Sequence, residues 1–190
     1  MSVVNCDNRF LQQPQPRAYR IRVADGTDVS PLTTVLMASF YPPNRLNRWF
    51  YALMRLGIHE DLKLRLSNQN PQYCCLAAVP PVAGQSANSL IGTVEVSLRS
   101  VSIWQPFQPR RPYLANLAVH PDHRQQGIGR HLILTGEDIV RSWGFHSLSL
   151  HVATNNQVAY RLYAGLGYRP ERSASRKWLP SKRILLTKPL

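Results

Sequence analysis

The sequence predicts one mixed α/β (or α+β) domain, and three observations lead to this prediction. A length of 190 residues, with 44% hydrophobic and 17% charged residues, suits one globular domain with a sizeable core. Segments with strand-like alternation are mixed along the chain with segments of helical period. No internal repeat or clear linker divides them. We expect a single domain over residues 18–190, after a flexible Gln- and Pro-containing arm over residues 1–17.

The first third of the domain predicts one strand followed by helices. YRIRVA, residues 19–24, alternates apolar and polar residues as a half-buried strand does. A helix follows, with Asp28 or Ser30 as its cap. Residues 44–66 predict further helix, with an interruption near Gly57.

The rest of the chain predicts six strands and two helices. The strand segments are residues 73–80, 89–100, 113–119, 147–153, 168–170 and 183–190. The first predicted helix begins near Ile128 and ends at Gly144, and the second covers residues 155–167. Both helices have apolar residues at helical spacing, so each is expected to pack one face on the sheet.

The charge of the chain is strongly positive. There are 23 Lys and Arg residues against 10 Asp and Glu residues, which gives a formal net charge of +13. An acidic ligand, protein, nucleic acid or membrane surface would suit this charge, and so would simple solubility. No helix-turn-helix, zinc ligand set or aromatic RNA-binding pattern is present, so nucleic acid is the weakest of these partners.

The cysteines and the N-terminal sequence indicate the cellular compartment of the protein. Cys6, Cys74 and Cys75 have the spacing of neither a disulfide framework nor a metal site, so we expect no metal. No stretch approaches the roughly 20 apolar residues of a membrane span. The N-terminus lacks the basic and apolar regions of a secretory signal. These features predict a cytoplasmic protein, or one soluble within an organelle.

The segment HPDHRQQGIGRHLI, residues 120–133, contains a glycine-bearing turn between a strand and a helix. A Walker loop would need Lys followed by Ser or Thr after its last glycine, and neither glycine has that sequence after it. A dinucleotide fingerprint would need a third glycine where Leu132 stands. The remaining readings are a pyrophosphate site at the helix N-terminus and an ordinary turn. Gly127 and Gly129 leave room for an anion, and Arg124 and Arg130 add positive charge.

A second motif, NNQVAYRLYAGLGY, lies in the next predicted helix. Helical spacing sets Asn156, Ala159 and Tyr163 on one face, and Gly167 and Tyr168 close the segment. A tyrosine on a helix face is by itself most often a core residue.

Together the two motifs resemble the GCN5-related N-acetyltransferase (GNAT) superfamily over roughly residues 20–190. The family loop (R/Q)xxGx(G/A) is matched by Arg124, Gly127 and Gly129. The family pattern NxxAxxxYxxxG(F/Y) is matched at every fixed position. The finer likeness is to bacterial and plastid members that acetylate protein amines. The resemblance implies a mostly antiparallel sheet of about six or seven strands, about four helices, and two splayed strands that hold acetyl-CoA.

The resemblance also assigns the donor site. Pantetheine would bond to the backbone of Leu117, Ala118 and Val119. The pyrophosphate would be held by Arg124, Gln125, Gln126, Gly127, Ile128, Gly129 and Arg130. Asn156 and Ala159 would lie near the pantetheine arm, with Tyr163 near the sulfur. A phenol stays protonated at neutral pH, so Tyr163 is expected to be the general acid that protonates the departing thiolate.

Two residues are candidates for the general base. Many protein acetyltransferases of this family have a glutamate five residues before the motif asparagine, and this sequence has His151 there. An imidazole suits an α-amine of pKa near 8 better than a lysine near 10.4. Glu95 is the carboxylate that lies well inside a predicted strand, and it would act through water.

The sequence leaves alternatives for the amine acceptor and for the function. In this family the acceptor site is lined by the first two helices and the last inter-strand loop, here residues 40–66 and 171–183, both basic. A basic rim favours an acidic protein or peptide and disfavours polyamines. The function expected is acetyl transfer to a protein α-amine or lysine. The alternative is a GNAT-like module that docks on a larger assembly through its basic surface.

Overall fold

The computed structural model of the chain describes residues 19–41, 48–68, 70–80, 90–100, 110–171 and 183–190. The N-terminal arm expected over residues 1–17 lies outside these ranges, as does most of the basic loop expected over residues 171–183. None of the helices in the described ranges has the length and apolar character to cross a membrane.

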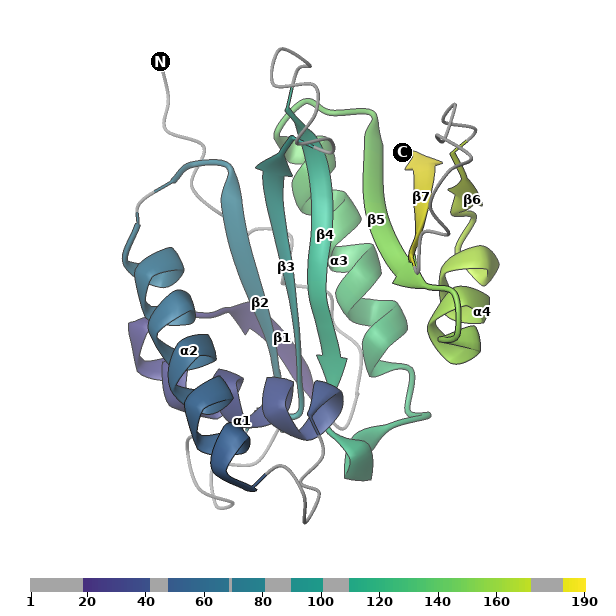
Figure 1. The fold of residues 1–190 in the computed structure, drawn as a ribbon. Coiled ribbons are helices and arrows are strands. Elements are labelled where there is room, and N and C mark those ends of the chain that lie inside the picture. The colour runs from purple at the N-terminus through teal and green to yellow at the C-terminus, as the bar shows by residue number, and fades with distance from the viewer. Residues whose placement is uncertain (1–18, 42–47, 69, 81–89, 101–109, 172–182) are drawn as a thin grey trace.

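One seven-stranded sheet forms the centre of the domain, in the order β1-β2-β3-β4-β5-β7-β6 (Figure 1). Every neighbouring pair is antiparallel except β4 and β5, which are parallel. The expected fold of a mixed, mostly antiparallel sheet is confirmed. The strands are β1 (Arg20–Val23), β2 (Tyr73–Val79), β3 (Gly92–Arg99), β4 (Arg111–Val119), β5 (Ser147–Ala153), β6 (Arg169–Pro170) and β7 (Arg183–Pro189).

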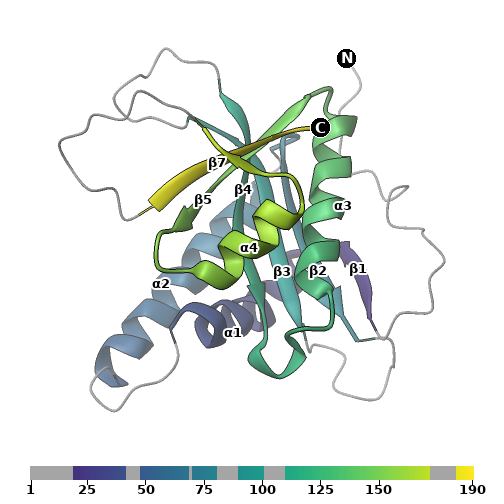
Figure 2. The ribbon, with the colours of Figure 1, turned by 90° about the vertical axis from the view of Figure 1, so that its right-hand side faces the viewer.

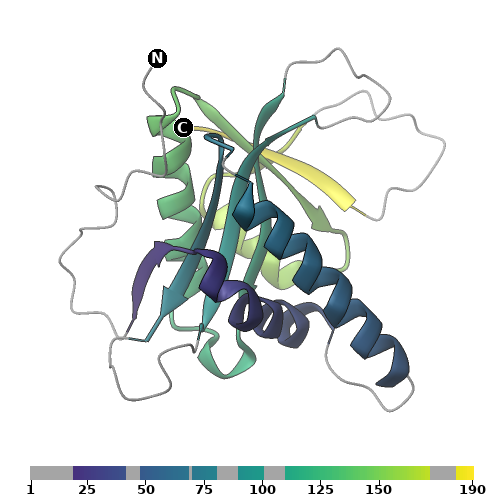
Figure 3. The same ribbon diagram turned by 90° about the vertical axis from the view of Figure 1, so that its left-hand side faces the viewer.

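Four α-helices in the described residues cover the two faces of this sheet unequally. They are α1 (Val29–Phe40), α2 (Arg48–Ser67), α3 (Ile128–Ser142) and α4 (Gln157–Gly165). Two 3-10 turns, η2 (Gly26–Asp28) and η4 (Pro121–His123), precede α1 and α3. In the two side views, α1 and α2 lie on one side of the sheet and α3 lies on the opposite side (Figures 2 and 3).

Strand register explains why the two faces differ, because residues paired across strands share a face. Leu76 pairs with Val94, and Leu114 pairs with Val96. All four are buried in the large apolar core that includes residues of α3 and α4. On the other face α1 covers a smaller core, which reaches Ala118 near the end of β4.

The rest of that second face is polar. Ser97 pairs with Tyr113, and Tyr113 pairs with Ser149, so one row of hydroxyl groups crosses β3, β4 and β5. In Figure 1, α1 and α2 lie toward the lower left of the sheet, and neither helix lies in front of β5 or the upper part of β4. Polar side chains that gather on one face of a sheet mark a candidate site.

Two local predictions were wrong. The helix expected to break near Gly57 is continuous as α2, because an exposed glycine lowers helix stability by about 1 kcal/mol without preventing the helix. Asp28 does not cap α1 with its side chain. Its carboxylate instead accepts hydrogen bonds from Arg22 Nη2 at 2.7 Å and from the Asp25 N–H at 2.9 Å. Asp25 caps η2, through a bond from the Thr27 N–H.

Candidate active site

The site is built on a bulge near the end of β4. The pairing with β3 passes from Glu95–Ala115 to Thr93–Ala118, so Asn116 and Leu117 both lie opposite one residue of β3. Asn116 has a φ of 52°, a left-handed conformation that asparagine tolerates better than most residues. A bulge of this kind turns backbone groups out of the ladder. The backbone from Leu117 to Val119 was expected to hold the donor, and it lies immediately after this turn.

The carboxylate of Glu95 binds the side chain of the bulge residue Asn116. Its Oε1 accepts a hydrogen bond of 2.8 Å from Asn116 Nδ2, and its Oε2 forms an ion pair with Arg65. Arg65 also binds Asp61 one turn earlier in α2. The Glu95 side chain is 1% exposed. Both of its oxygens therefore bind protein groups, and Glu95 joins β3 to the bulge of β4 and to α2.

The gap between β4 and β5 is bridged by a tyrosine. The two strands pair at Tyr113–Ser149 and then diverge toward their C-terminal ends (Figure 1). The Tyr113 hydroxyl lies 2.8 Å from His151 Nδ1 and accepts a bond of 3.1 Å from the His151 N–H. Because that oxygen already accepts the backbone proton, we assign its own proton to the bond toward Nδ1, which leaves the imidazole hydrogen on Nε2.

Tyr113 is the residue that sequence reasoning missed. It was included in the strand at 113–119 but given no chemical role. The signal was weak: a tyrosine at the polar phase of a strand, 38 residues from the histidine it meets. Only the parallel pairing of β4 with β5 brings the two together.

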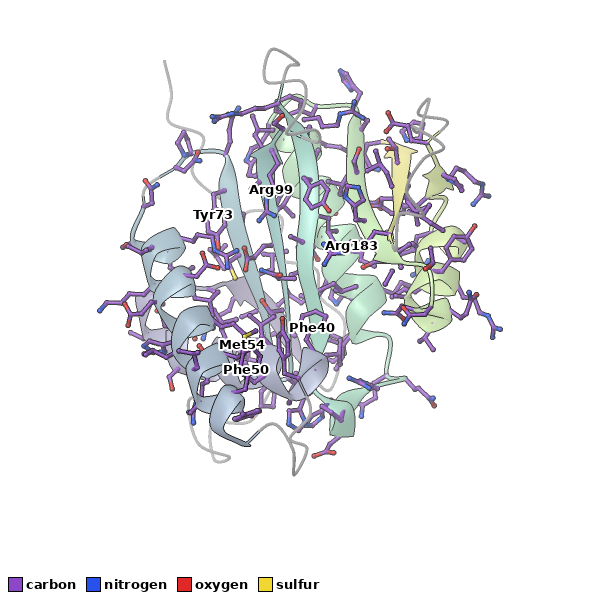
Figure 4. All side chains as sticks on the ribbon, viewed as in Figure 1. Phe40, Phe50, Met54, Tyr73, Arg99 and Arg183 are labelled. Atoms are coloured by element: carbon purple, nitrogen blue, oxygen red, sulfur yellow. The ribbon has the colours of Figure 1, made fainter. Side chains whose placement is uncertain are left out.

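The surroundings of this pair shift the pKa values of both His151 and Tyr113. Partial burial lowers the pKa of His151 below its ordinary value, and the positive charge of Arg183 lowers it further. Burial raises the pKa of Tyr113, while the His151 N–H, Arg99 and Arg183 offset part of that rise. The Arg99 guanidinium lies 5.4 Å from the centre of the Tyr113 ring. Figure 4 shows Arg99 and Arg183 on the same face of the sheet.

The glycine loop follows β4 and opens α3. Gly127 is the N-cap of α3 at a φ of 77°, and no side chain caps the helix. The N–H groups of the first helical turn, from Ile128 onward, have no partner within the helix. A Cβ added at Gly127 would meet nothing within 4 Å, so the space beside this residue is open.

Neighbouring residues fix the loop in place. Arg124 Nε donates to the Val119 carbonyl at 3.3 Å, which ties the loop to the end of β4. Ile128 is buried in the large core. Gly92 of β3 lets this packing occur, because a Cβ there would lie 3.1 Å from both the Ala118 oxygen and Ile128 Cγ2. The other expected loop residues, Gln125, Gln126 and Arg130, are exposed, and Gly129 is half-buried.

The residues of the second motif lie at the start of α4 and within it. Asn156 is the N-cap, with its Oδ1 accepting a bond of 3.1 Å from the Ala159 N–H, so it precedes the helix instead of sharing a helical face. That part of the sequence prediction was wrong, because asparagine caps helices well. Ala159 is half-buried. Tyr163 is buried against Tyr168 at 5.9 Å between ring centres. Burial, with a smaller effect of Tyr113, raises the pKa of Tyr163 to about 12.

Curated proteins similar to this chain are acetyltransferases. GCN5-related N-acetyltransferase 4, chloroplastic, of Arabidopsis thaliana is 36% identical over 67 residues, or 34% of this chain and 23% of that protein. Thialysine N-epsilon-acetyltransferase of Mus musculus is 31% identical over 121 residues, 63% of this chain and 69% of that protein. The ribosomal protein bS18-alanine N-acetyltransferase of Escherichia coli K12 is 37% identical over 68 residues, 36% and 45% of the two chains. The chain thus spans less than half the length of two of these relatives.

A solved structure has the same fold. The PaiA N-acetyltransferase from Thermoplasma acidophilum, in complex with coenzyme A, superposes with a TM-score of 0.68 at 19% identity. The match covers 90% of this chain and 99% of that one. The profile of the acetyltransferase (GNAT) family matches residues 37–168, which is well over half of the chain. The chain therefore belongs to the acetyltransferase (GNAT) family.

Proposed function

We propose that this protein is an acetyl-CoA-dependent N-acetyltransferase that acts on the α-amine of a protein or peptide. The observation that carries the proposal is the Tyr113–His151 hydrogen bond, which sets a neutral base across the gap between β4 and β5. The gap opens toward the end of β4, where the glycine loop begins. The proton-transfer pair lies on β4 and β5, and the helix N-terminus that suits an anion follows β4 in the chain.

The residues present fit acetyl-CoA. Gly127 has open space around its Cβ position and directly precedes the first turn of α3, whose N–H groups suit a pyrophosphate. Residues 124–130 would hold that group, and the backbone from Leu117 to Val119 would hold the pantetheine arm. When bound, acetyl-CoA supplies an acetyl group activated as a thioester.

His151 acts as the base through Tyr113. In the assigned network the Tyr113 hydroxyl donates its hydrogen bond to His151 Nδ1. When the Tyr113 oxygen takes a proton from the acceptor amine, it passes its own proton to Nδ1. The amine nitrogen, freed of that proton, uses its lone pair to form the new bond to the acetyl carbon. Arg183 destabilises the resulting imidazolium, so the proton is readily returned to solvent at neutral pH.

Tyr163 is the proton donor to the leaving sulfur. Its pKa of about 12 keeps the phenol protonated throughout the neutral range, as a general acid requires. With a thiol pKa of about 8.5 as a guide, the departing thiolate is basic enough to take a proton near neutral pH. After bond formation the nitrogen carries one proton too many, and loss of that proton restores the Tyr163 phenol. Bond formation to nitrogen, bond cleavage from sulfur and the proton transfers then balance.

An α-amine suits this base better than a lysine does. The lowered pKa of His151 makes it a weak base, and an α-amine of pKa near 8 needs less driving force than a lysine near 10.4. The E. coli relative is named for an alanine of a ribosomal protein, whereas the mouse relative is named for an ε-amine of a small amino acid. The chemistry of His151 favours the first kind of acceptor.

Calorimetric titration tests the donor half of this proposal. We expect micromolar binding of acetyl-CoA and of desulfo-CoA, and none of ATP at the same concentrations. Desulfo-CoA shares the pyrophosphate and the pantetheine chain but lacks the sulfur, so equal affinity would locate binding in the loop and the β4 backbone. Equal binding of all three ligands would mean a generic phosphate site, and no binding would contradict the proposal.

A further inference from the structure

The open sheet face around Tyr113 and His151 carries two arginines from opposite directions. Arg99 is the last residue of β3, and its guanidinium lies over the Tyr113 ring at 5.4 Å. Arg183 is the first residue of β7 and pairs with Ala153, two residues beyond His151 on β5. Since partners at this register and residues two apart in a strand share a face, Arg183 lies on the same face as His151. Figure 4 shows both arginines there.

The carboxylates of this face are bound elsewhere. Glu95 and Asp61 both pair with Arg65, beneath the bulge. Glu171 binds Arg111 at 2.8 Å and accepts a hydrogen bond of 2.9 Å from Thr187. The contacts described for Arg99 are the Ser97 hydroxyl, at 3.1 Å from Nε, and the Tyr113 ring. Neither group carries a negative charge. The potential next to the reaction pair is therefore positive.

We propose that Arg99 and Arg183 form an anion subsite that selects peptides with acidic residues directly after the N-terminal amine. This inference rests on the proposed function, because it assumes that the acceptor amine is brought to Tyr113. A carboxylate one or two residues from that amine then lies within reach of a guanidinium on either side. The same charges repel a peptide with lysine at those positions.

The pKa direction of His151 agrees with this geometry. Arg183 lowers that pKa through its positive charge, so the charge of Arg183 acts at the reaction pair. An acidic acceptor would relieve the repulsion that Arg183 exerts on the imidazolium. The subsite thus links recognition of the acceptor to proton transfer.

Three peptides that differ only at their second and third residues test the subsite. They carry Glu-Glu, Gln-Gln or Lys-Lys at those positions, and share one N-terminal residue and one fluorescent tail. The dissociation constant from fluorescence anisotropy, with desulfo-CoA present and absent, is the first readout, and kcat/KM with acetyl-CoA is the second. For the wild type we expect the Glu peptide to be favoured over the Gln peptide by about fivefold at low salt. The Lys peptide should be the weakest, and about 0.5 M salt should reduce the differences.

Variants assign the preference to the two arginines. Arg99→Gln and Arg183→Gln should each bring the Glu-to-Gln ratio close to one, whereas Arg99→Lys should keep most of it because the charge remains. Arg20→Gln is the matched control: Arg20 is an exposed arginine on β1, at the other end of the sheet order, and its loss should leave the ratio unchanged. A wild-type ratio of one, or a ratio that survives both Gln variants, would overturn the subsite.

Failure of the proposed function would look different. If the wild type acetylated none of the peptides, the transferase proposal would fail, while the anisotropy ratios would still judge the anion subsite. If it acetylated all three equally, the transferase proposal would stand and the subsite would fall. Preference for the Lys peptide would reverse the charge argument and point to a basic acceptor.

Discussion

Tyr113 and His151 meet across the gap between β4 and β5, with 2.8 Å from the phenol oxygen to Nδ1. The same oxygen accepts the backbone proton of His151 at 3.1 Å, so one hydroxyl holds both the side chain and the strand that carries it. With the phenol proton assigned to the bond toward Nδ1, the imidazole hydrogen lies on Nε2 and Nδ1 is the acceptor. The expected consequences concern rate, pH dependence and stability.

Loss of the imidazole should remove the base. His151→Ala is expected to lower kcat/KM for peptide acetylation by about a hundredfold or more, the usual contribution of a general base. The dissociation constant of desulfo-CoA should stay nearly constant, because His151 is not among the residues proposed to hold the donor. Steady-state kinetics across pH 6 to 9 checks the rate, and retention of full kcat/KM across that range would show that His151 is not required.

Glu95 should behave as a structural residue in the same experiments. Glu95→Gln breaks the buried ion pair with Arg65, which we expect to lower the free energy of unfolding by about 3 kcal/mol. Chemical denaturation measures this loss. Below the unfolding temperature of the variant, the shape of the pH–rate profile should match that of the wild type. A missing acidic limb with unchanged stability would instead identify Glu95 as the base.

Tyr113→Phe should reduce kcat and leave the peptide KM little changed. The phenyl ring keeps its place under Arg99, but the proton path to Nδ1 and the bond to the His151 N–H are lost. The stability cost should be small, about 1 kcal/mol. Tyr160→Phe is the matched control, because Tyr160 is a half-buried tyrosine of α4, and this change should leave kcat unaltered. Equal kcat for Tyr113→Phe and the wild type would show that His151 acts directly.

The acidic limb of the pH–rate profile should follow His151. Its pKa is held below the usual value of about 6.5, so activity with the neutral Gln peptide should be lost on acidification only below that pH. Removing the positive charge in Arg183→Gln favours the imidazolium, raises the pKa of His151 and should move the limb to higher pH. Arg20→Gln should not move it. A shift to lower pH in Arg183→Gln would contradict the assignment.

Tyr163→Phe should separate chemistry from donor binding. The loss of the acid is expected to lower kcat by about a hundredfold, with the acetyl-CoA dissociation constant within about threefold of the wild type. Because the pKa of Tyr163 is raised to about 12, no alkaline loss of activity below pH 10 should trace to this residue. Calorimetry and stopped-flow measurement of thiol release check both parts. Loss of acetyl-CoA binding would make Tyr163 a packing residue.

Two glycine substitutions test the loop. Gly127→Ala places a Cβ in a left-handed conformation, which costs about 1 kcal/mol. The free loop would relax to avoid this strain and would regain it on binding, so acetyl-CoA should bind about fivefold more weakly. Gly57→Ala is the control, since its Cβ would meet nothing within 4 Å and α2 is continuous there. That change should raise the free energy of unfolding by up to about 1 kcal/mol and leave the acetyl-CoA affinity constant. Equal affinity for both variants would exclude the loop from donor binding.

Periodic segments were the most predictable part of the fold. Apolar strand segments predicted β2, β3 and β5, and apolar residues at helical spacing predicted α3, because each contributes buried residues to the same core. The loop motif was placed correctly at the start of α3, where Gly127 is the N-cap. The cap at Asp28 was mistaken because its carboxylate found a stronger partner in Arg22, which belongs to the preceding strand.

The site itself was only partly predictable. His151 was found through its spacing from Asn156, but Tyr113 was not, because their meeting depends on parallel pairing of two strands that are separated by α3. Glu95 looked like a free carboxylate in a strand, and its partners Arg65 and Asn116 come from α2 and β4. Long-range pairing of this kind has no local signal in a sequence.

The position of the acetyl group on a product is the most direct test of amine acetylation through His151. A peptide with a free α-amine, glutamate at its second and third residues and one lysine near its end would be incubated with acetyl-CoA and the wild-type protein. Tandem mass spectrometry would then locate the modification, with His151→Ala as the matched protein. We predict an acetyl group on the α-amine with the wild type and almost none with His151→Ala. Acetylation of the lysine alone, or equal α-amine product from both proteins, would contradict the proposed mechanism.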